Sequence, residues 1–167
     1  MATFDPMLNE FREEAATTKR VLERVPEAKL AWKPHAKSMS LGQLAWHVAS
    51  VPGGVAHITQ QESFDVTQGN FQPPQPKSVG EILSAHDDSV KNVESVLQSL
   101  TDQKAREKWR LMNNDRELFS RPRIEAMRSI MLNHWYHHRG QLSVYLRLLD
   151  IPVPVIYGPS ADENPFG

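Results

Sequence analysis

Apolar residues recur at steps of three and four along most of this chain of 167 residues, which is the spacing of one face of an α-helix. The first such series ends at Pro26 and consists of Leu8, Phe11, Ala15, Thr18, Leu22 and Val25. Because a helix with one apolar face must bury that face against another element, the spacing predicts helices packed on helices.

A second helix begins after Ser40, which forms the capping-box pattern S-x-x-Q with Gln43. Pro52 and two glycines then interrupt the apolar face of this helix. Since proline has no N–H to donate to the carbonyl of Val48, we expect Pro52 to kink or end the helix. A continuation to Gln61 is the alternative.

A third helix of about six turns is predicted from Val79 to Leu100, with Ser78 and Glu81 as a second capping box. The stretch before it, residues 64–77 (FDVTQGNFQPPQPK), is polar and rich in proline and is predicted as a connecting loop. Its length raises the question of a function for the loop itself.

The last predicted helix is the longest, with Ser120 as its cap and an apolar series from Ile124 to Leu149. Between Leu100 and Ser120 the helical spacing weakens, and the turn pattern Asn113-Asn114-Asp115 fits a short hairpin or an irregular excursion. The proline-rich tail after residue 150 is predicted to lie extended on the helices.

Four amphipathic helices around one core predict an all-α four-helix bundle, and the length suits a single domain over residues 1–167. Two of the connections are long. A simple up-down-up-down order with tight turns therefore does not fit this chain.

The charge balance excludes several classes of partner. The chain has 19 Lys+Arg and 20 Asp+Glu, so its net charge of −1 offers no basic field for nucleic acid or an anionic membrane. No apolar run approaches the roughly 18–20 residues of a membrane span, and the charged N-terminal stretch lacks the apolar core of a signal peptide. We therefore expect a cytoplasmic protein without nucleic-acid or membrane partners.

The unusual feature of the composition is seven histidines beside no cysteine, which excludes disulfides, thiolate metal sites and a cysteine nucleophile. His134 and His138 are four residues apart, a spacing that places both imidazoles on one face of a helix, although chance alone yields about 0.25 such pairs. Both lie within the apolar series of the last helix, and His47 has a similar position on the second. We expect these three imidazoles to meet inside the bundle.

Three histidine ligands would leave a fourth coordination position open, which is the pattern of catalytic rather than structural zinc. Three neutral imidazoles do not compensate the charge of a divalent ion, so the site is expected to lower the pKa of bound water or to bind a thiolate. Gln141 and Tyr145 project from nearly the same face. Together with His137 at the mouth of the site, they are the candidate catalytic residues.

The other histidines, His35, His57 and His86, are expected to be unrelated to this site, since His57 lies about 15 Å along a helix beyond His47. Arg139 would contact an anionic substrate or belong to an ion pair. The sequence has no H-E-x-x-H, E-x-x-H, G-x-S-x-G, Walker or G-x-G-x-x-G pattern. Zincin-type proteases, di-iron bundles, α/β-hydrolases and these nucleotide-binding loops are therefore excluded.

The stretches SMSLGQLAWHVAS, NHWYHHRGQLSVYLRLLDIPVP and YGPSADE resemble the DinB family, also called DinB/YfiT-like, and the resemblance spans nearly the whole chain. It implies a four-helix bundle with a long crossover between helices two and three, and a homodimer. It also implies a divalent cation held by His47, His134 and His138. Zinc or nickel is expected first, and iron, cobalt or manganese next.

The resemblance further implies a metal-dependent thiol S-transferase, because relatives of this kind move a low-molecular-weight thiol onto a small-molecule substrate. Since the chain has no cysteine, the sulfur would have to come from the cosubstrate. Two alternatives stay open. One is a metal-dependent hydrolase in which Gln141, Tyr145 or His137 orients the substrate, and the other is a stress-induced metal-binding protein without catalytic activity.

Overall fold

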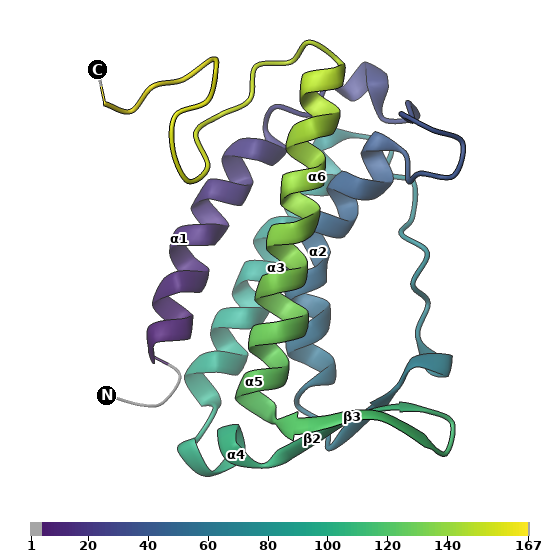
Figure 1. The fold of residues 1–167 in the computed structure, drawn as a ribbon, viewed down its shortest axis with the longest axis vertical. Helices are drawn as coiled ribbons and strands as arrows, with labels where there is room; N and C mark the ends of the chain where they lie inside the picture. Colours follow the sequence, from purple (N-terminus) through teal and green to yellow (C-terminus); the bar gives the residue numbers. More distant parts are fainter. Residues whose placement is uncertain (1–4, 167) are drawn as a thin grey trace.

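A computed structural model describes residues 5–166, and helices make up most of this part of the chain (Figure 1). The long helices are α1 (Asp5–Leu22), α2 (Leu41–Ile58), α3 (Val79–Ser99) and a continuous segment formed by α5 (Arg123–Met127), the π-helix η3 (Arg128–Asn133) and α6 (His134–Leu148). The short helices are η1 (Glu27–Lys29), η2 (Val66–Gln68) and α4 (Asp102–Arg106).

The order of the long helices is not simply up and down. In Figure 1, α2 and α3 run in the same direction, while α1 and α6 run in the opposite one. The connection between α2 and α3, residues 59–78, therefore returns along one side of the molecule (Figure 1). This long connection matters for the site described below, because it passes beside α2.

A small sheet covers one end of the helices and corrects the all-α expectation. It contains β1 (Ser63–Asp65), β2 (Lys108–Asn113) and β3 (Arg116–Pro122), with β1 parallel and β3 antiparallel to β2. The hairpin turn between β2 and β3 includes Asn114 at φ 49°, a left-handed conformation that asparagine tolerates. The chain is thus mostly helical with a three-stranded sheet, and the prediction of a purely helical bundle is met only in its helical part.

The predicted start of the last helix is wrong. Ser120 does not cap it but lies in β3 opposite Arg110. The helix begins at Arg123, directly after Pro122. β3 pairs with β2 over residues 116–122, so the short hairpin allowed by the turn pattern at residues 113–115 is confirmed, and it extends past Ser120.

The two predicted capping boxes differ in the structure. Ser40 and Gln43 form both bonds, since Ser40 Oγ accepts from the Gln43 N–H at 3.1 Å and Gln43 Oε1 accepts from the Ser40 N–H at 3.0 Å. Ser78 Oγ accepts from the Glu81 N–H at 3.2 Å, but the Glu81 carboxylate accepts from Lys77 instead of Ser78. The first box is confirmed and the second is only half formed.

Pro52 does not end α2, which continues to Ile58 as the alternative reading allowed. The carbonyl of Val48, which Pro52 leaves without a backbone donor, accepts a hydrogen bond from Trp135 Nε1 at 2.8 Å. One residue further on, Ser89 Oγ of α3 accepts from the Gly53 N–H at 2.8 Å. Side chains of α6 and α3 thus bond to backbone groups around Pro52, and α2 remains helical through the proline.

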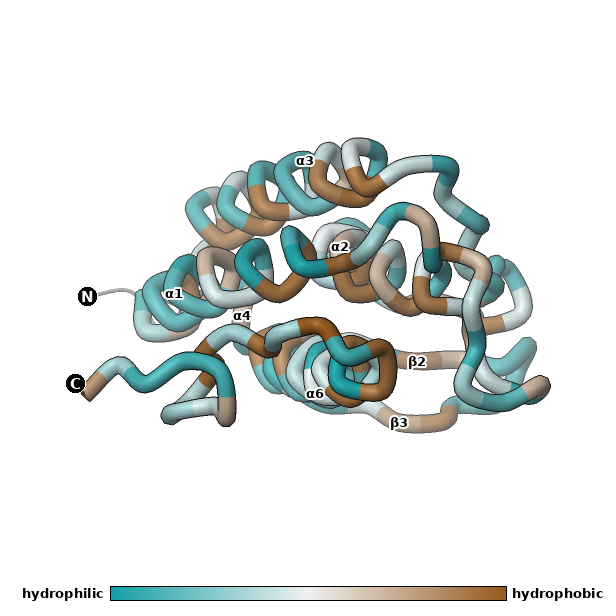
Figure 2. Tube along the Cα trace, turned by 90° about the horizontal axis from the view of Figure 1, so that it is seen from above, coloured by the Kyte–Doolittle hydropathy of each residue, from teal (hydrophilic) through white to brown (hydrophobic). Residues whose placement is uncertain are grey.

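Apolar side chains from the long helices fill the space between them, and the brown segments of α2, α3 and α6 face inward in Figure 2. α1 and α2 lie between α3 and α6 in this view (Figure 2). Phe11 of α1 stacks on Trp135 of α6 with ring centroids 5.3 Å apart, and both rings are buried. Such a pair contributes on the order of 1 kcal/mol beyond its buried area.

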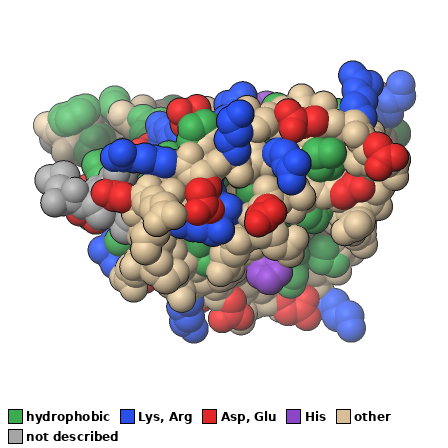
Figure 3. Space-filling view, turned by 90° about the horizontal axis from the view of Figure 1, so that it is seen from below, with side chains coloured by type: hydrophobic (Ala, Val, Ile, Leu, Met, Phe, Trp, Pro, Cys, Tyr) green, Lys and Arg blue, Asp and Glu red, His purple; other side chains and the backbone are tan. Residues whose placement is uncertain are grey.

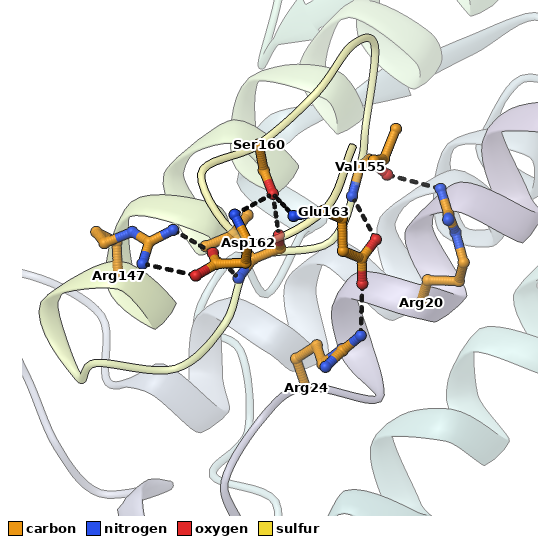
Figure 4. A network of polar contacts seen from close by, with 8 residues as sticks. Arg20, Arg24, Arg147, Val155, Ser160, Asp162 and Glu163 are labelled. Atoms are coloured by element: carbon orange, nitrogen blue, oxygen red, sulfur yellow. Dashed lines mark hydrogen bonds and ion pairs between the residues drawn. The ribbon is translucent and has the colours of Figure 1, made fainter. Parts of the chain in front are cut away.

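The tail after α6 lies against the helices but is not extended as predicted, because it folds back on itself and Ser160 Oγ donates to the carbonyl of Val153 at 2.7 Å. Two acidic residues fasten it to the helices (Figure 4). Asp162 pairs with Arg147 of α6, and Glu163 pairs with Arg24, just after α1, at 2.7 Å. Ser160 Oγ accepts from the N–H groups of both acids, at 3.1 and 2.9 Å. The stretch YGPSADE therefore has a structural role in docking the tail.

Among residues 5–166, no helix combines the length and the apolar character needed to cross a bilayer. On the face shown in Figure 3, acidic and basic side chains are interspersed. That face has no broad basic patch of the kind that binds the phosphates of nucleic acids.

Candidate metal centre

Three histidines from two helices converge at one point between α2 and α6. The ring centroids of His47 and His138 lie 4.4 Å apart, those of His134 and His138 4.5 Å, and those of His47 and His134 5.2 Å. One ring nitrogen from each residue lies within 4.8 Å of the others. Within the described residues this is the group of side chains that could hold a metal ion.

The contact between Trp135 and Val48 explains why these helices bring the histidines together. Trp135 follows His134 and is almost fully buried, and Val48 follows His47. The indole N–H of Trp135 bonds to the backbone carbonyl of Val48, so each partner of this bond is the chain neighbour of a histidine. The bond therefore joins α6 to α2 at the level of the site.

The histidines lie nearer the surface than the sequence predicts. The buried residues of α6 are Trp135, Arg139, Leu142 and Leu146, whereas His134 is exposed and His138 half-buried. The π-helix η3 immediately precedes His134. A π-helical turn shifts the phase of the helix that follows, by about 100° for one extra residue. The prediction assumed an uninterrupted α-helix and therefore placed His134 and His138 in the core. The structure places them at the edge of the core.

Partial burial of the rings lowers the pKa of all three imidazoles. It is the largest cause that lowers the pKa of His47 to about 4, with His138 and His134 as further causes. Burial also lowers the pKa of His134 and of His138. All three rings are therefore neutral at pH 7, and neutral imidazole is the form that binds metal ions.

The donor atoms fit a divalent cation. The Nε2 atoms of His47 and His134 are 2.9 Å apart, and two ligands of a tetrahedral zinc ion stand about 3.3 Å apart at the usual bond length. His138 Nδ1 lies 2.7 Å from Gln141 Oε1, an acceptor that assigns the proton to Nδ1 and leaves the Nε2 lone pair free. Small side-chain adjustments would suffice to receive an ion.

A groove of about 600 Å³ lies beside the three histidines, and two segments form its walls. One wall is α2, and the other is the connection between α2 and α3. The apolar lining includes Trp46, Val51, Val55, Ile58, Phe64 and Phe71. Volumes of about 300–1,000 Å³ are typical of sites for small molecules, so the groove is large enough for a substrate.

The capping box of α2 also holds the second wall in place. The Gln43 side-chain amide donates to the carbonyl of Pro73 at 3.3 Å, and Ser40 Oγ donates to Gln75 Oε1 at 2.6 Å. The amide of Gln75 in turn donates to the carbonyl of Leu30 at 3.1 Å. The helix start predicted from sequence thus also positions the connection across the groove, which the sequence did not reveal.

The three predicted catalytic residues occupy different places. Gln141 bonds to His138, as described above. His137 is exposed beside His138, with ring centroids 4.9 Å apart. Tyr145 donates its hydroxyl to the carbonyl of Met39 at 3.3 Å, and Met39 lines the groove. The structure therefore places Gln141 against a histidine, His137 on the solvent side and Tyr145 behind a wall residue.

Arg139 belongs to an ion pair and not to the groove. Its guanidinium is buried, lies 2.5 Å from the carboxylate of Glu14 and donates to Thr18 at 3.0 Å. Tyr157 of the tail also bonds to it. Among residues 5–166, no atom of another element lies within 4 Å of the place where a Cβ of Gly140 would stand, so no described helix packs closely against it.

The other histidines stay apart from the centre, as predicted. His86 is buried in α3, with Nδ1 at 3.6 Å from Asp87. His57 is exposed and lies toward α3, beside Ala85 and Asp88. The ring nitrogen of His35 accepts from the Lys37 N–H at 3.1 Å.

The residues that sequence reasoning missed are those of the second wall. Phe64 lies in β1, and Phe71, Pro73 and Pro74 follow in the connection. The unusual length of the connection and its mixture of aromatic and proline residues were the available signal. Their position beside the three histidines depends on the path of the chain in space, which local spacing does not encode.

Comparisons with known proteins agree with this architecture. The chain is 26% identical over 162 residues to YrdA of Bacillus subtilis (strain 168), described as an uncharacterized protein, and the match covers 96% of this chain and 92% of YrdA. A DinB-like protein of Bacillus cereus ATCC 10987 has a similar fold, with a TM-score of 0.70, 21% identity and coverage of 90% of this chain and 95% of that one.

The DinB-like protein YjoA of Bacillus subtilis also has this fold, with a TM-score of 0.70, 16% identity and coverage of 92% of this chain and 97% of that one. The model of the DinB family matches residues 1–164, nearly the entire chain. This match agrees with the resemblance noted in the sequence around His47, His134 and His138. The chain therefore belongs to the DinB family.

Proposed function

We propose that this protein binds a divalent metal ion through His47, His134 and His138 and transfers a low-molecular-weight thiol to a small electrophile. The observation that carries this proposal is the convergence of three neutral imidazoles at the edge of a groove. The family supports the same ligand set. Zinc or nickel is the proposed ion, with iron, cobalt or manganese next, because imidazole ligands suit several of these metals.

A bound divalent cation would lower the pKa of a thiol and hold its sulfur as the thiolate, which is the nucleophilic form. The sulfur has to come from a cosubstrate because the chain has no cysteine. We place the reaction in the cytoplasm, where low-molecular-weight thiols are kept reduced.

In the proposed transfer, the sulfur–carbon bond forms while the bond between that carbon and the leaving group breaks. The leaving group departs with the electron pair, and the thiol proton passes to solvent or to His137, which is the exposed histidine beside His138. Gln141 keeps His138 in the required tautomer and orientation. Tyr145 holds the backbone of Met39 at the groove wall.

The test is the consumption of an electrophile such as monochlorobimane with individual low-molecular-weight thiols, with and without zinc. Turnover that needs both a thiol and the metal, and is lost in His134→Ala, supports the transferase. Hydrolysis of ester or amide substrates without added thiol would support the hydrolase instead. Absence of turnover with every thiol, in protein shown to contain metal, would reject the transferase.

We also propose a homodimer that uses the exposed face of α6. Val144 and Leu148 lie one turn apart on this face and are 56% and 57% exposed, and the open position at Gly140 leaves room for a second helix. A helix of a second copy that packed on this face would bury both side chains, which is favourable. Sedimentation should show a dimer that Val144→Asp dissociates, whereas a monomeric wild type contradicts this part of the proposal.

A further inference from the structure

The side chains that line the groove include no Asp, Glu, Lys or Arg. The charged residues of the connection, Glu62, Asp65 and Lys77, lie outside this lining. Residues 41–58, which form α2, contain no Asp, Glu, Lys or Arg. Residues 66–76 of the connection contain none either. The groove thus lies between two uncharged segments in a chain whose charged residues are 23% of the total. An anionic or cationic group bound between these walls would find no counter-charge on a lining side chain.

The polar groups of the lining are few and partly occupied. Ser50 Oγ donates to the carbonyl of Trp46 at 2.8 Å, and Asn70 Oδ1 accepts from the Gln72 N–H at 3.1 Å. The three histidines are the one concentration of lone pairs beside the groove, and they lie at its edge. A ligand would therefore find polar partners at the histidines and mainly apolar contacts elsewhere.

Aromatic side chains stand on both walls. Trp46 comes from α2, and Phe64 and Phe71 come from the connection. The ring of Phe71 folds back over Gly69, so closely that a Cβ at Gly69 would lie 2.6 Å from the ring. Phe71 is 67% exposed although it lines the groove, which leaves apolar surface available to a bound molecule.

We infer that the groove selects an uncharged, apolar moiety of the size of a substituted aromatic ring, which contacts both walls while one donor atom faces the three histidines. The inference rests on the proposed function and names its substrate class. Burying an ionised group without a partner is costly, whereas burying apolar surface is favourable. Any charged part of the thiol cosubstrate therefore extends outside the groove, and the electrophile is the neutral partner.

The experiment compares two thiols of the same shape that differ in one charge, 4-methylbenzyl mercaptan and 4-(mercaptomethyl)benzoate. Their binding to the full chain is measured by calorimetry at neutral pH, both with zinc and with metal-free protein. We expect the neutral thiol to bind at least about tenfold more tightly in both forms, with lower affinities when zinc is absent. In the metal-free protein the walls alone distinguish the two probes.

Two variants that each add one positive charge test whether the preference for the neutral probe arises in the groove. Phe71→Arg places a cation at the groove and should raise the affinity of the carboxylate probe relative to the neutral probe about threefold, since nearby opposite charges attract. The ratio is used because both probes lose the same contact with the Phe71 ring. Phe166→Arg, in the exposed part of the tail and outside the groove, makes the same substitution with the same net charge and should leave this ratio of affinities unchanged. Equal gains in both variants would show a general charge effect and overturn the assignment to the groove.

The binding experiment distinguishes a failure of this inference from a failure of the proposed function. Equal binding of the two probes, tighter binding of the carboxylate, or no binding of either probe to either form overturns the inference. A protein that takes up none of the proposed ions (zinc, nickel, iron, cobalt or manganese) overturns the proposed function. The ratio of affinities in the metal-free form still decides the preference of the walls.

Discussion

The bond between Trp135 Nε1 and the Val48 carbonyl allows a quantitative test of how the two helices of the site are held together. The donor and acceptor are 2.8 Å apart, and both residues are buried. Trp135→Phe removes the donor and leaves a buried carbonyl without a partner, because Pro52 offers no N–H. An orphaned acceptor of this kind costs about 1–3 kcal/mol, and the smaller ring adds a packing loss of about 1 kcal/mol.

Pro52→Ala supplies the missing N–H to the same carbonyl, and the double variant therefore isolates the hydrogen bond. We expect Trp135→Phe to cost about 3 kcal/mol alone and about 1 kcal/mol less in the Pro52→Ala background. Zinc affinity should also fall in Trp135→Phe and fall less in the Pro52→Ala background, because Trp135 and Val48 are the chain neighbours of His134 and His47. Urea unfolding of the metal-free chain and zinc titration are the two measurements.

Trp109→Phe is the matched control. Trp109 is fully buried, and in the described structure its indole nitrogen has no hydrogen-bond partner, so this substitution removes volume and no bond. It should not couple to Pro52→Ala and should leave zinc affinity unchanged. If the Trp135 and Pro52 variants are additive within about 0.4 kcal/mol, the bond does not replace the missing backbone donor and the reasoning is refuted.

Three further predictions concern the ligands and the tail. Gln141→Leu removes the acceptor for His138 Nδ1 and should weaken zinc binding about tenfold in titrations; undiminished affinity would contradict its positioning role. The pKa of His47 is about 4, against about 6.5 in an unfolded chain, so between these values the unfolded state binds more protons. The metal-free protein should therefore lose stability as the pH falls through this window, by about 2 kcal/mol from this residue after allowance for its partial exposure. His47→Gln should flatten the dependence in urea unfolding, and an unchanged slope would refute the assignment. Asp162→Asn weakens the pair with Arg147 and should speed hydrogen exchange of the tail amides, whereas exchange at the wild-type rate would show that the pair does not hold the tail.

The helices could be predicted well because their signals are local. The capping box at Ser40 and the apolar spacing of α2 and α3 involve residues three or four apart. The hairpin of β2 and β3 was one of the two alternatives that the turn pattern Asn113-Asn114-Asp115 indicated. The third strand could not be predicted in the same way, since β1 pairs with β2 across more than forty residues, with Ser63 opposite Arg110. Ser120 looked like a helix cap for the same reason, because its partner in β2 is not visible in a local window.

The sequence by itself determined which side chains would form the candidate centre. His134 and His138 share a helix face through a spacing of four, and His47 takes its place from the spacing of α2. The family resemblance pointed to the same set. These choices depend on helical periodicity, which is a property of the local chain.

The tertiary structure alone decided the depth of the centre and the character of the space beside it. The π-helix before His134 and the burial of Trp135 place the histidines at the edge of the core. The connection that carries Phe71 forms a wall only because the chain returns past α2. Both results depend on contacts between residues far apart in sequence, and their energies depend on the packing of the whole molecule.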